Sequence, residues 1–180
     1  MSAWRAITCV LIFLVILPNA ASAADNAEAV AVFELVDNNG NTVSHGDYRG
    51  QYVLLAFGFT NCPHVCPMMA ANMAGALRIV EQESTGIFVS VDTERDTPEI
   101  VQKYASSFNE DMIGLTGSYH QINAAVDNFN ATYVVSKSQK SYTVQHTSNI
   151  FVIDPDGLII ETFPLNARPS EIAAVINAAD

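Results

Sequence analysis

The chain alternates short apolar runs with segments whose apolar residues recur at helical spacing. Two runs, residues 52–59 and 87–91, are almost continuously apolar, which is typical of strands buried on both faces. Further strands are predicted at residues 31–36, 141–145, 149–153 and 158–163. The Asn/Gly-rich residues 37–41 and the sequence DPDG at residues 154–157 predict tight turns between strands.

Four helices are predicted from apolar stripes at helical spacing. The stripes are Met73/Ala76/Leu77/Val80, Ile100/Val101/Tyr104/Phe108, Ile122/Ala125/Val126/Phe129 and Ile172/Val175/Ile176/Ala179. The second helix has a clear start, with Thr97 as its N-cap and Pro98 as its first helical residue.

Strands therefore alternate with helices, and no internal repeat, low-complexity segment or long linker interrupts them. This order predicts an α/β fold with a central mixed sheet, helices on both faces and an added N-terminal β-hairpin. A cysteine pair between a buried strand and a helix start, in a chain of 180 residues, favours a thioredoxin-like fold. We expect a single thioredoxin-like domain over residues 24–180.

Residues 1–23 have the pattern of a secretory signal peptide. Arg5 precedes an apolar run over residues 6–17, and Ala21-Ser22-Ala23 offers a small-residue cleavage site. The run is shorter than the ~20 residues that a membrane-spanning helix needs. We therefore expect export to the periplasm, or to the equivalent outer face of an energy-transducing membrane. Membrane association is expected only if this segment is retained.

Composition narrows the functional classes. A hydrophobic content of 49% excludes an intrinsically disordered chain. The 8 Lys and Arg residues against 19 Asp and Glu residues give a formal net charge of −11, and cleavage would remove Arg5 as well. Such an acidic surface repels phosphate backbones and disfavours nucleic-acid binding. We expect a monomer whose charge serves solubility or the steering of a partner.

Cys62 and Cys66 are the cysteines that remain after the predicted cleavage, since Cys9 lies in the signal segment. They follow the apolar run at residues 52–59, where a helix is predicted to begin. The partial positive charge of a helix N-terminus lowers the pKa of a thiol and favours the thiolate, which binds metals and attacks disulfides. In an exported protein such a pair also tends to form a disulfide.

The spacing of the pair leaves both chemistries open. Three residues separate the cysteines, whereas thioredoxin-type redox motifs have two. Helical residues four apart lie on one face, ~5–6 Å apart at Cβ, which suits two sulfurs on one metal ion. A disulfide is also possible if Cys62 lies just before the helix. Thiolates select Cu(I), zinc or iron–sulfur clusters, and imidazole suits copper and zinc.

Four histidines are candidates for a further ligand. His64 lies between the cysteines, but a helix would turn it away from their shared face. His45 and His120 lie in polar surroundings and are expected at the surface. His146 lies at the junction of two predicted strands, and such loops often carry sites. Position alone leaves both a structural and a ligand role open for His146.

Four segments together resemble the Sco/SenC family of copper-binding, thioredoxin-fold proteins. They are FGFTNCPHVCP, VSVDTERDTPEIVQKYASSF, GLTGSYHQI and YTVQHTSNIFVIDPDG, in this order along the chain. The resemblance covers nearly all of the chain after residue 23. It implies that Cys62, Cys66 and His146 bind copper, as Cu(I) and as Cu(II).

The resemblance also implies a role. Members of this family serve the assembly of the copper A centre of cytochrome c oxidase, as metallochaperones, as thiol-disulfide reductases of the oxidase's cysteines, or as both. The expected function is that of an exported metallochaperone rather than a turnover enzyme. The expected partner is cytochrome c oxidase subunit II or another copper-accepting protein.

The chain departs from the family pattern at two places. Gln145 stands where the family often has Asp before the histidine, so an acidic group that would orient the imidazole is missing. The family's Asp-Pro-Glu-Arg-Asp-Thr is here DTERDT, residues 92–97. Within it, Asp92 and Arg95 either lie near the cysteines or form a capped loop with a salt bridge.

The methionines after the cysteine pair favour packing over metal binding. Met73 lies on the apolar stripe of its helix, so we expect it in the core. Met68 and Met69 lie early enough in the helix to line the site, and their thioethers would suit Cu(I). Packing is the expected role for both.

Three alternatives to a copper chaperone remain. Cys62 and Cys66 would be the redox pair of a thiol-disulfide oxidoreductase that works without metal. A peroxiredoxin-like peroxidase is disfavoured because its threonine precedes the cysteine by three residues, whereas Thr60 precedes Cys62 by two. A purely structural disulfide would leave the Cys-Pro motif at a helix start unexplained.

Overall fold

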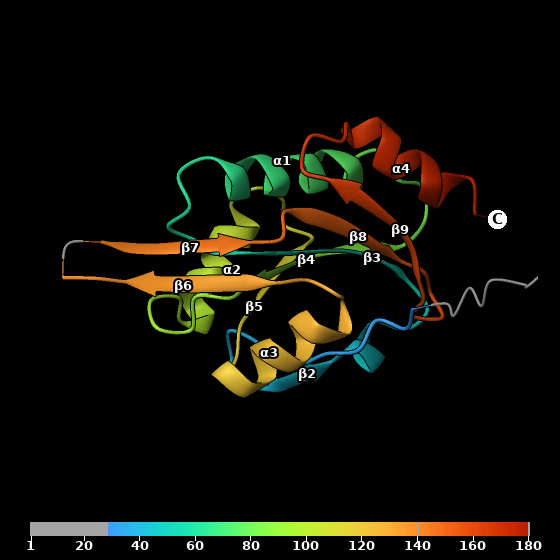
Figure 1. The fold of residues 1–180 in the computed structure, drawn as a ribbon. Coiled ribbons are helices and arrows are strands. Elements are labelled where there is room, and N and C mark those ends of the chain that lie inside the picture. The colour runs from blue at the N-terminus through green and yellow to red at the C-terminus, as the bar shows by residue number, and fades with distance from the viewer. Residues whose placement is uncertain (1–28, 140, 180) are drawn as a thin grey trace, which may run out of the picture.

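The computed structural model describes residues 29–139 and 141–179 (Figure 1). Its strands are β1 (Glu34–Val36), β2 (Thr42–Ser44), β3 (Tyr52–Gly58), β4 (Ser84–Ser90), β5 (Met112–Leu115), β6 (Tyr133–Lys137), β7 (Tyr142–His146), β8 (Asn149–Ile153) and β9 (Ile159–Pro164). Its helices are the 3-10 turn η1 (His45–Tyr48), α1 (Val65–Leu77), α2 (Pro98–Ser106), α3 (Tyr119–Asn128) and α4 (Pro169–Asn177). The predicted signal peptide, residues 1–23, lies outside the described residues. None of the described helices has the length and apolar character to cross a membrane.

A five-stranded mixed sheet with the strand order β5-β4-β3-β8-β9 forms the centre of the molecule (Figure 1). Strands β3, β4 and β5 are parallel, and β8 is antiparallel to both of its neighbours, β3 and β9. The parallel strands are joined by helical crossovers, as parallel pairs require. The predicted α/β fold with a central mixed sheet is confirmed.

Strand β3 is buried along its whole length because both faces of the sheet are covered. Leu54 and Ala56 belong to the core on the face of α1, α2 and α4. Val53, Leu55 and Phe57 belong to the core on the opposite face, with α3. Side chains alternate between the faces of a strand, so a strand between two apolar layers is apolar at every position. The continuous apolar run in the sequence follows from this.

The predicted N-terminal β-hairpin is confirmed. Strands β1 and β2 pair in antiparallel fashion, with Leu35 opposite Val43 and Leu35 fully buried. In the connecting turn, the Asp37 carboxylate accepts the backbone N–H groups of Asn39 and Asn41. Gly40 has a φ of +79°, which a glycine adopts without steric cost. The hairpin thus closes through local hydrogen bonds in its turn, and Leu35 and the partly buried Val43 pack it against the core.

A second hairpin, β6–β7, forms a two-stranded sheet of its own in the described part of the chain. It extends past the end of the central sheet, as the orange ribbon in Figure 1 shows. Its register pairs Tyr133 with His146 at the base and Lys137 with Tyr142 towards the tip. Side chains of β7 alternate between half-buried and exposed, so the hairpin has one inner and one outer face.

Two strands and one face assignment were not predicted correctly from the sequence. Strand β5 has only four residues, and one of them is Gly114, where an added Cβ would overlap the backbone of Val101. Strand β6 lies outside the central sheet and lacks a long apolar run. Ile100 was assigned to the buried stripe of α2, but 45% of its surface is exposed, whereas its neighbour Val101 is fully buried. The helix is rotated so that Val101 and Ala105 face the sheet.

Because Val101 is buried and Ile100 is largely exposed, substitutions at these adjacent positions are expected to change the free energy of unfolding by different amounts. Val101→Ala is expected to lower the free energy of unfolding by about 1–3 kcal/mol, because it removes two buried methyl groups. Ile100→Ala is expected to change it by less than about 1 kcal/mol, because the side chain is largely solvated. Urea unfolding of the two variants measures both values. A larger loss for Ile100→Ala would mean that the face of α2 is assigned wrongly.

Candidate metal centre

Cys62 and Cys66 lie where the buried strand β3 gives way to helix α1. Cys62 is half-buried in the turn before the helix, and Cys66 is fully buried in its first turn. The backbone N–H of Cys66 donates to Cys62 Sγ over 3.4 Å. The first N–H groups of a helix have no partner within the helix. The sulfur of Cys62 therefore takes the place of an N-cap.

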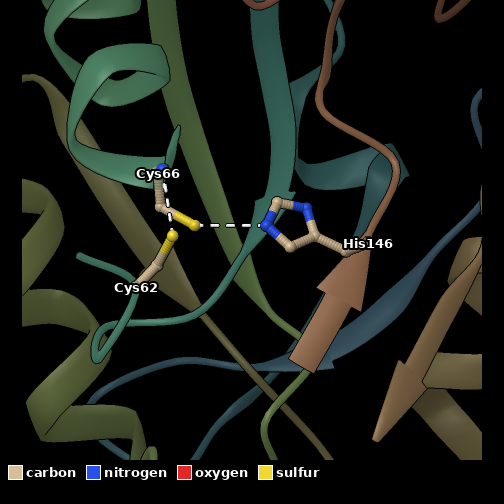
Figure 2. A group of neighbouring side chains, drawn as sticks. All are labelled: Cys62, Cys66 and His146. Carbon is tan, nitrogen blue, oxygen red and sulfur yellow. Dashed lines mark hydrogen bonds between the residues drawn. The ribbon is translucent and has the colours of Figure 1, made fainter. Parts of the chain in front are cut away.

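The third candidate ligand atom belongs to a residue 80 positions after Cys66 in the sequence. His146 is the last residue of β7, and its Nε2 lies 3.2 Å from Cys66 Sγ (Figure 2). The two sulfurs and a nitrogen of His146 all lie within 4.8 Å of one another. The structure thus brings together the three residues that the sequence named, across a separation of 80 residues between Cys66 and His146.

The imidazole of His146 is fixed in one orientation by its backbone neighbour. His146 Nδ1 lies 2.8 Å from the carbonyl oxygen of Thr147, and only a protonated Nδ1 donates to that oxygen. In the neutral ring this leaves the lone pair on Nε2, which faces the cysteines. The edge of the ring also packs on Phe59, with centroids 5.8 Å apart at 88°. Burial lowers the pKa of His146 more than its bond to Thr147 raises it, so the ring is held neutral, as metal binding requires.

Gln145 therefore has no part in orienting the imidazole. Adjacent residues of a strand point to opposite faces, and Gln145 is exposed on the outer face of the hairpin while His146 is half-buried on the inner face. The sequence left open what the missing acidic residue costs. In this structure His146 is oriented by the hydrogen bond that its Nδ1–H donates to the carbonyl oxygen of Thr147.

The Cys62 thiol is the more acidic of the two. Its partial burial would raise its pKa, but hydrogen bonds from the Cys66 backbone, the Cys66 side chain and the backbone N–H groups of His64 and Val65 outweigh this and lower the pKa. These donors belong to the start of α1, where the helix dipole also favours a negative charge. Cys62 is thus the half-exposed, activated sulfur of the pair.

Cys66 has the opposite character. Burial is the main reason why its pKa is raised, and the neighbouring Cys62 and Asp96 raise it further, against one backbone hydrogen bond from Phe59. The packing around it is tight, since a Cβ at Gly58 would lie 3.0 Å from Cys66 Sγ and 2.6 Å from Phe88. A glycine at the end of β3 is therefore what leaves room for the second sulfur.

The remaining candidates lie elsewhere. His64 and His120 are exposed, and His45, predicted at the surface, is half-buried with Nδ1 3.3 Å from the carbonyl oxygen of Phe33. Met69 and Met73 are fully buried in the core, as expected from packing. Met68 is 44% exposed, so it does not have the packing role that we predicted for it.

The loop at residues 92–97 forms the salt bridge that the sequence offered as one of two interpretations. Asp92 is fully buried, forms an ion pair with Arg95 and accepts the hydroxyl of Tyr142 over 2.6 Å. The loop is thus a salt-bridged turn, yet Tyr142 lies on the strand that carries His146. Sequence reasoning had no means to pair Asp92 with a residue 50 positions away.

Asp96 is a site residue that the sequence analysis missed. It is 3% exposed, and its carboxylate accepts the backbone N–H of Thr60 over 2.8 Å and the Thr60 hydroxyl over 2.6 Å. The hydroxyl of Ser90 donates to the same carboxylate. These bonds anchor the turn that leads to Cys62. The only sequence signal was an acidic residue directly before the N-cap Thr97, which is common at helix starts.

This donor set is chemically selective. Two sulfurs and one imidazole suit soft or borderline ions such as Cu(I), Cu(II) and Zn(II), and hard ions such as Mg²⁺ and Ca²⁺ prefer oxygen. Cys62 and Cys66 are free thiols whose sulfurs lie within 4.8 Å of each other, close enough for thiol–disulfide chemistry as well. The geometry thus supports either metal binding or thiol–disulfide exchange.

Comparisons with known proteins identify the family of this chain. The family model described as SCO1/SenC matches residues 21–179. A SCO2-like protein of Rickettsia typhi is 34% identical over 154 residues, which are 82% of this chain and 76% of the relative. The structure of Bradyrhizobium japonicum ScoI with copper bound has a TM-score of 0.73 and 33% identity, and the match covers 83% of this chain and 98% of that one.

A third relative is informative about redox chemistry. BsSco, described as a member of the Sco family of cytochrome c oxidase assembly proteins with a disulfide switch, has a TM-score of 0.66 and 27% identity. The match covers 84% of this chain and 93% of that one. These neighbours confirm the predicted thioredoxin-like fold.

The asymmetry of the two thiols predicts an order of modification. In the reduced protein at neutral pH, iodoacetamide is expected to label Cys62 well before Cys66, because Cys62 is more exposed and its lowered pKa gives more thiolate. Raising the pH through the Cys62 pKa should accelerate the first labelling step. Peptide mass spectrometry over time measures both rates.

The matched controls are the two single variants. Cys66→Ser should still label at residue 62, and Cys62→Ser should label slowly at residue 66. Faster labelling of Cys66 in the wild type would contradict the assigned burial.

Proposed function

Because the chain belongs to the SCO1/SenC family, we propose that it is an exported copper-binding metallochaperone. Its ligands are the thiolates of Cys62 and Cys66 and the Nε2 atom of His146. Its task is to help assemble the copper A centre of cytochrome c oxidase. The observation that supports this most is the convergence of these three donor atoms within 4.8 Å.

The donor set accounts for how copper would be held as cargo. Two thiolates and one neutral imidazole form a three-coordinate site, which Cu(I) accepts readily, whereas Cu(II) needs a further ligand such as water. His146 offers Nε2 because its Nδ1 is engaged with Thr147. Copper binding releases the proton of the buried Cys66, so affinity rises with pH until both sulfurs are ionised.

The partial exposure of Cys62 would allow bound copper to leave the site. Cys62 is half-exposed just before α1, while Cys66 is fully buried in its first turn. An incoming thiolate of an acceptor protein can replace Cys62 first, since the exposed ligand is the accessible one. Copper then passes by ligand exchange, one bond forming as another breaks. The proposed acceptor is cytochrome c oxidase subunit II or another copper-accepting protein, and BsSco, from the same family, is described as such an assembly protein.

The proposed location is the periplasm or the equivalent outer face of an energy-transducing membrane. The signal-like pattern of residues 1–23 supports it. There, oxidation of Cys62 and Cys66 to a disulfide would remove both sulfur ligands. Copper loading is therefore coupled to the redox state of the pair.

A second candidate is a thiol-disulfide oxidoreductase that uses the same pair. The specific observation in its favour is the contrast between the activated Cys62 and the buried Cys66. In such an enzyme Cys62 attacks a partner disulfide, and Cys66 then resolves the mixed disulfide. The disulfide switch described for BsSco fits this chemistry too.

Copper binding tests the first proposal. The reduced protein is expected to bind one copper per chain, and Cys62→Ser/Cys66→Ser to bind none. His146→Ala should weaken Cu(II) binding at least about tenfold, since a nitrogen ligand is lost. His64→Ala is the matched control, because this exposed imidazole lies between the cysteines and should leave the affinity unchanged. Copper titration with metal analysis measures these values; unchanged stoichiometry in the double cysteine variant would overturn the metallochaperone proposal.

Thiol–disulfide exchange separates the two candidates. If the protein is a metallochaperone, reduction of a model disulfide should be slow with copper chelated, and His146→Ala should not change its rate. If it is a reductase, the metal-free protein should turn over at a rate that Cys62→Ser abolishes. A fluorescent disulfide substrate, assayed with and without chelator, measures this. Fast, metal-independent turnover would favour the oxidoreductase.

A further inference from the structure

Side-chain contacts attach the described part of the ligand-bearing hairpin to the rest of the fold. Strands β6 and β7 form their own sheet in the described part of the chain. Val144, on the inner face, packs against the core. Tyr133 at the base donates its hydroxyl to Asn123 on α3 over 2.9 Å. The 3.2 Å approach of His146 to Cys66 depends on how this hairpin is held.

The loop at residues 92–96, which we name the clamp loop, holds the hairpin. The hydroxyl of Tyr142 donates to the buried carboxylate of Asp92 over 2.6 Å. The guanidinium of Arg95, paired with Asp92, stacks 3.9 Å from the centroid of the Tyr142 ring. On the partner strand, directly opposite Tyr142, Lys137 forms an ion pair with Glu94. Three residues of one loop thus engage one hairpin.

The same loop also holds the segment that carries the cysteines. Asp96 accepts both the backbone N–H and the hydroxyl of Thr60, two residues before Cys62. Arg95 lies 5.7 Å from the centroid of Phe59, and the Phe59 ring contacts His146 edge-on. The clamp loop is therefore tied to both halves of the metal centre.

A contact that fixes Tyr142 also constrains the imidazole of His146, because the two residues lie on the same strand, β7. Residues at i, i+2 and i+4 of a strand share one face, so Tyr142, Val144 and His146 all point inward. Holding Tyr142 against Asp92 fixes the rotation of that face. Burial and the neighbouring Asp92 raise the pKa of Tyr142 to about 12, so its hydroxyl stays protonated and donates at physiological pH.

We propose that the clamp loop sets the position of His146 relative to the cysteines, with Tyr142, Asp92 and Arg95 as positioning residues. The proposal rests on the copper site proposed above. Cu(I) is held well by two thiolates, whereas Cu(II) depends more on the nitrogen ligand. The clamp therefore governs retention of Cu(II) more than retention of Cu(I), and loosening it favours release.

The test compares two tyrosines of the hairpin. Tyr142→Phe removes the hydroxyl bond to Asp92, and Tyr133→Phe, the matched control, removes the hydroxyl bond to Asn123. Tyr142→Phe is expected to speed Cu(II) dissociation to excess chelator about tenfold, the equivalent of one lost hydrogen bond to a charged group. Its Cu(I) affinity should change less than about twofold, as should both properties in Tyr133→Phe. Stopped-flow absorption measures the dissociation.

A readout without metal separates positioning from general stability. In the metal-free protein, the nuclear Overhauser contact between the rings of Phe59 and His146 should weaken in Tyr142→Phe and persist in Tyr133→Phe. Arg95→Lys, which keeps the charge but loses the planar stacking, should weaken it as well, and it decides the matter if Tyr142→Phe fails to fold. Equal behaviour of the two tyrosine variants, or of Arg95→Lys and the wild type, would overturn the proposal.

His146→Ala in the same series distinguishes two kinds of failure. If His146→Ala leaves Cu(II) dissociation unchanged, the proposed ligand set is wrong. If His146→Ala speeds dissociation and Tyr142→Phe does not, only the clamp is wrong.

Discussion

The approach of His146 Nε2 to within 3.2 Å of Cys66 Sγ is the contact on which the site depends. The sulfur belongs to a helix start at the end of the central strand β3, and the nitrogen to a hairpin outside the central sheet. A buried sulfur beside a fixed lone pair is costly unless something pairs with both. Without the ion, a thiol proton facing the imidazole supplies that pairing. With a soft metal bound, the ion would take its place.

The two cysteines differ in reactivity because their surroundings differ. Amide groups at the start of α1 lower the pKa of Cys62, and burial raises that of Cys66. One position is thus accessible and reactive, and the other is sheltered. The same asymmetry would serve copper exchange with an acceptor or attack on a disulfide, so one site supports both chemistries. The redox state of the pair then decides whether a metal can be held at all.

Two buried carboxylates connect the segments that carry the candidate metal ligands. Asp92 and Asp96 are 0% and 3% exposed, and both have hydrogen-bond partners from other segments of the chain. Buried carboxylates are tolerated only when they are paired in this way. Both lie in the clamp loop. Asp92 binds Tyr142, on the strand that carries His146, and Asp96 binds Thr60, in the segment that leads to Cys62. Most of the acidic residues in the described part of the chain are by contrast exposed.

The sequence by itself determined the architecture and the donor residues. Apolar periodicity predicted every long strand and all four helices, because burial on one or two faces leaves a direct pattern in the chain. The cysteine pair and His146 were named from their motif and the family resemblance. Only the tertiary structure decided that Thr147 orients the imidazole, that Asp96 anchors the cysteine turn and that Asp92 meets Tyr142. Contacts between distant, non-periodic polar residues leave no local signal, since their partners are chosen by the packing of the whole chain.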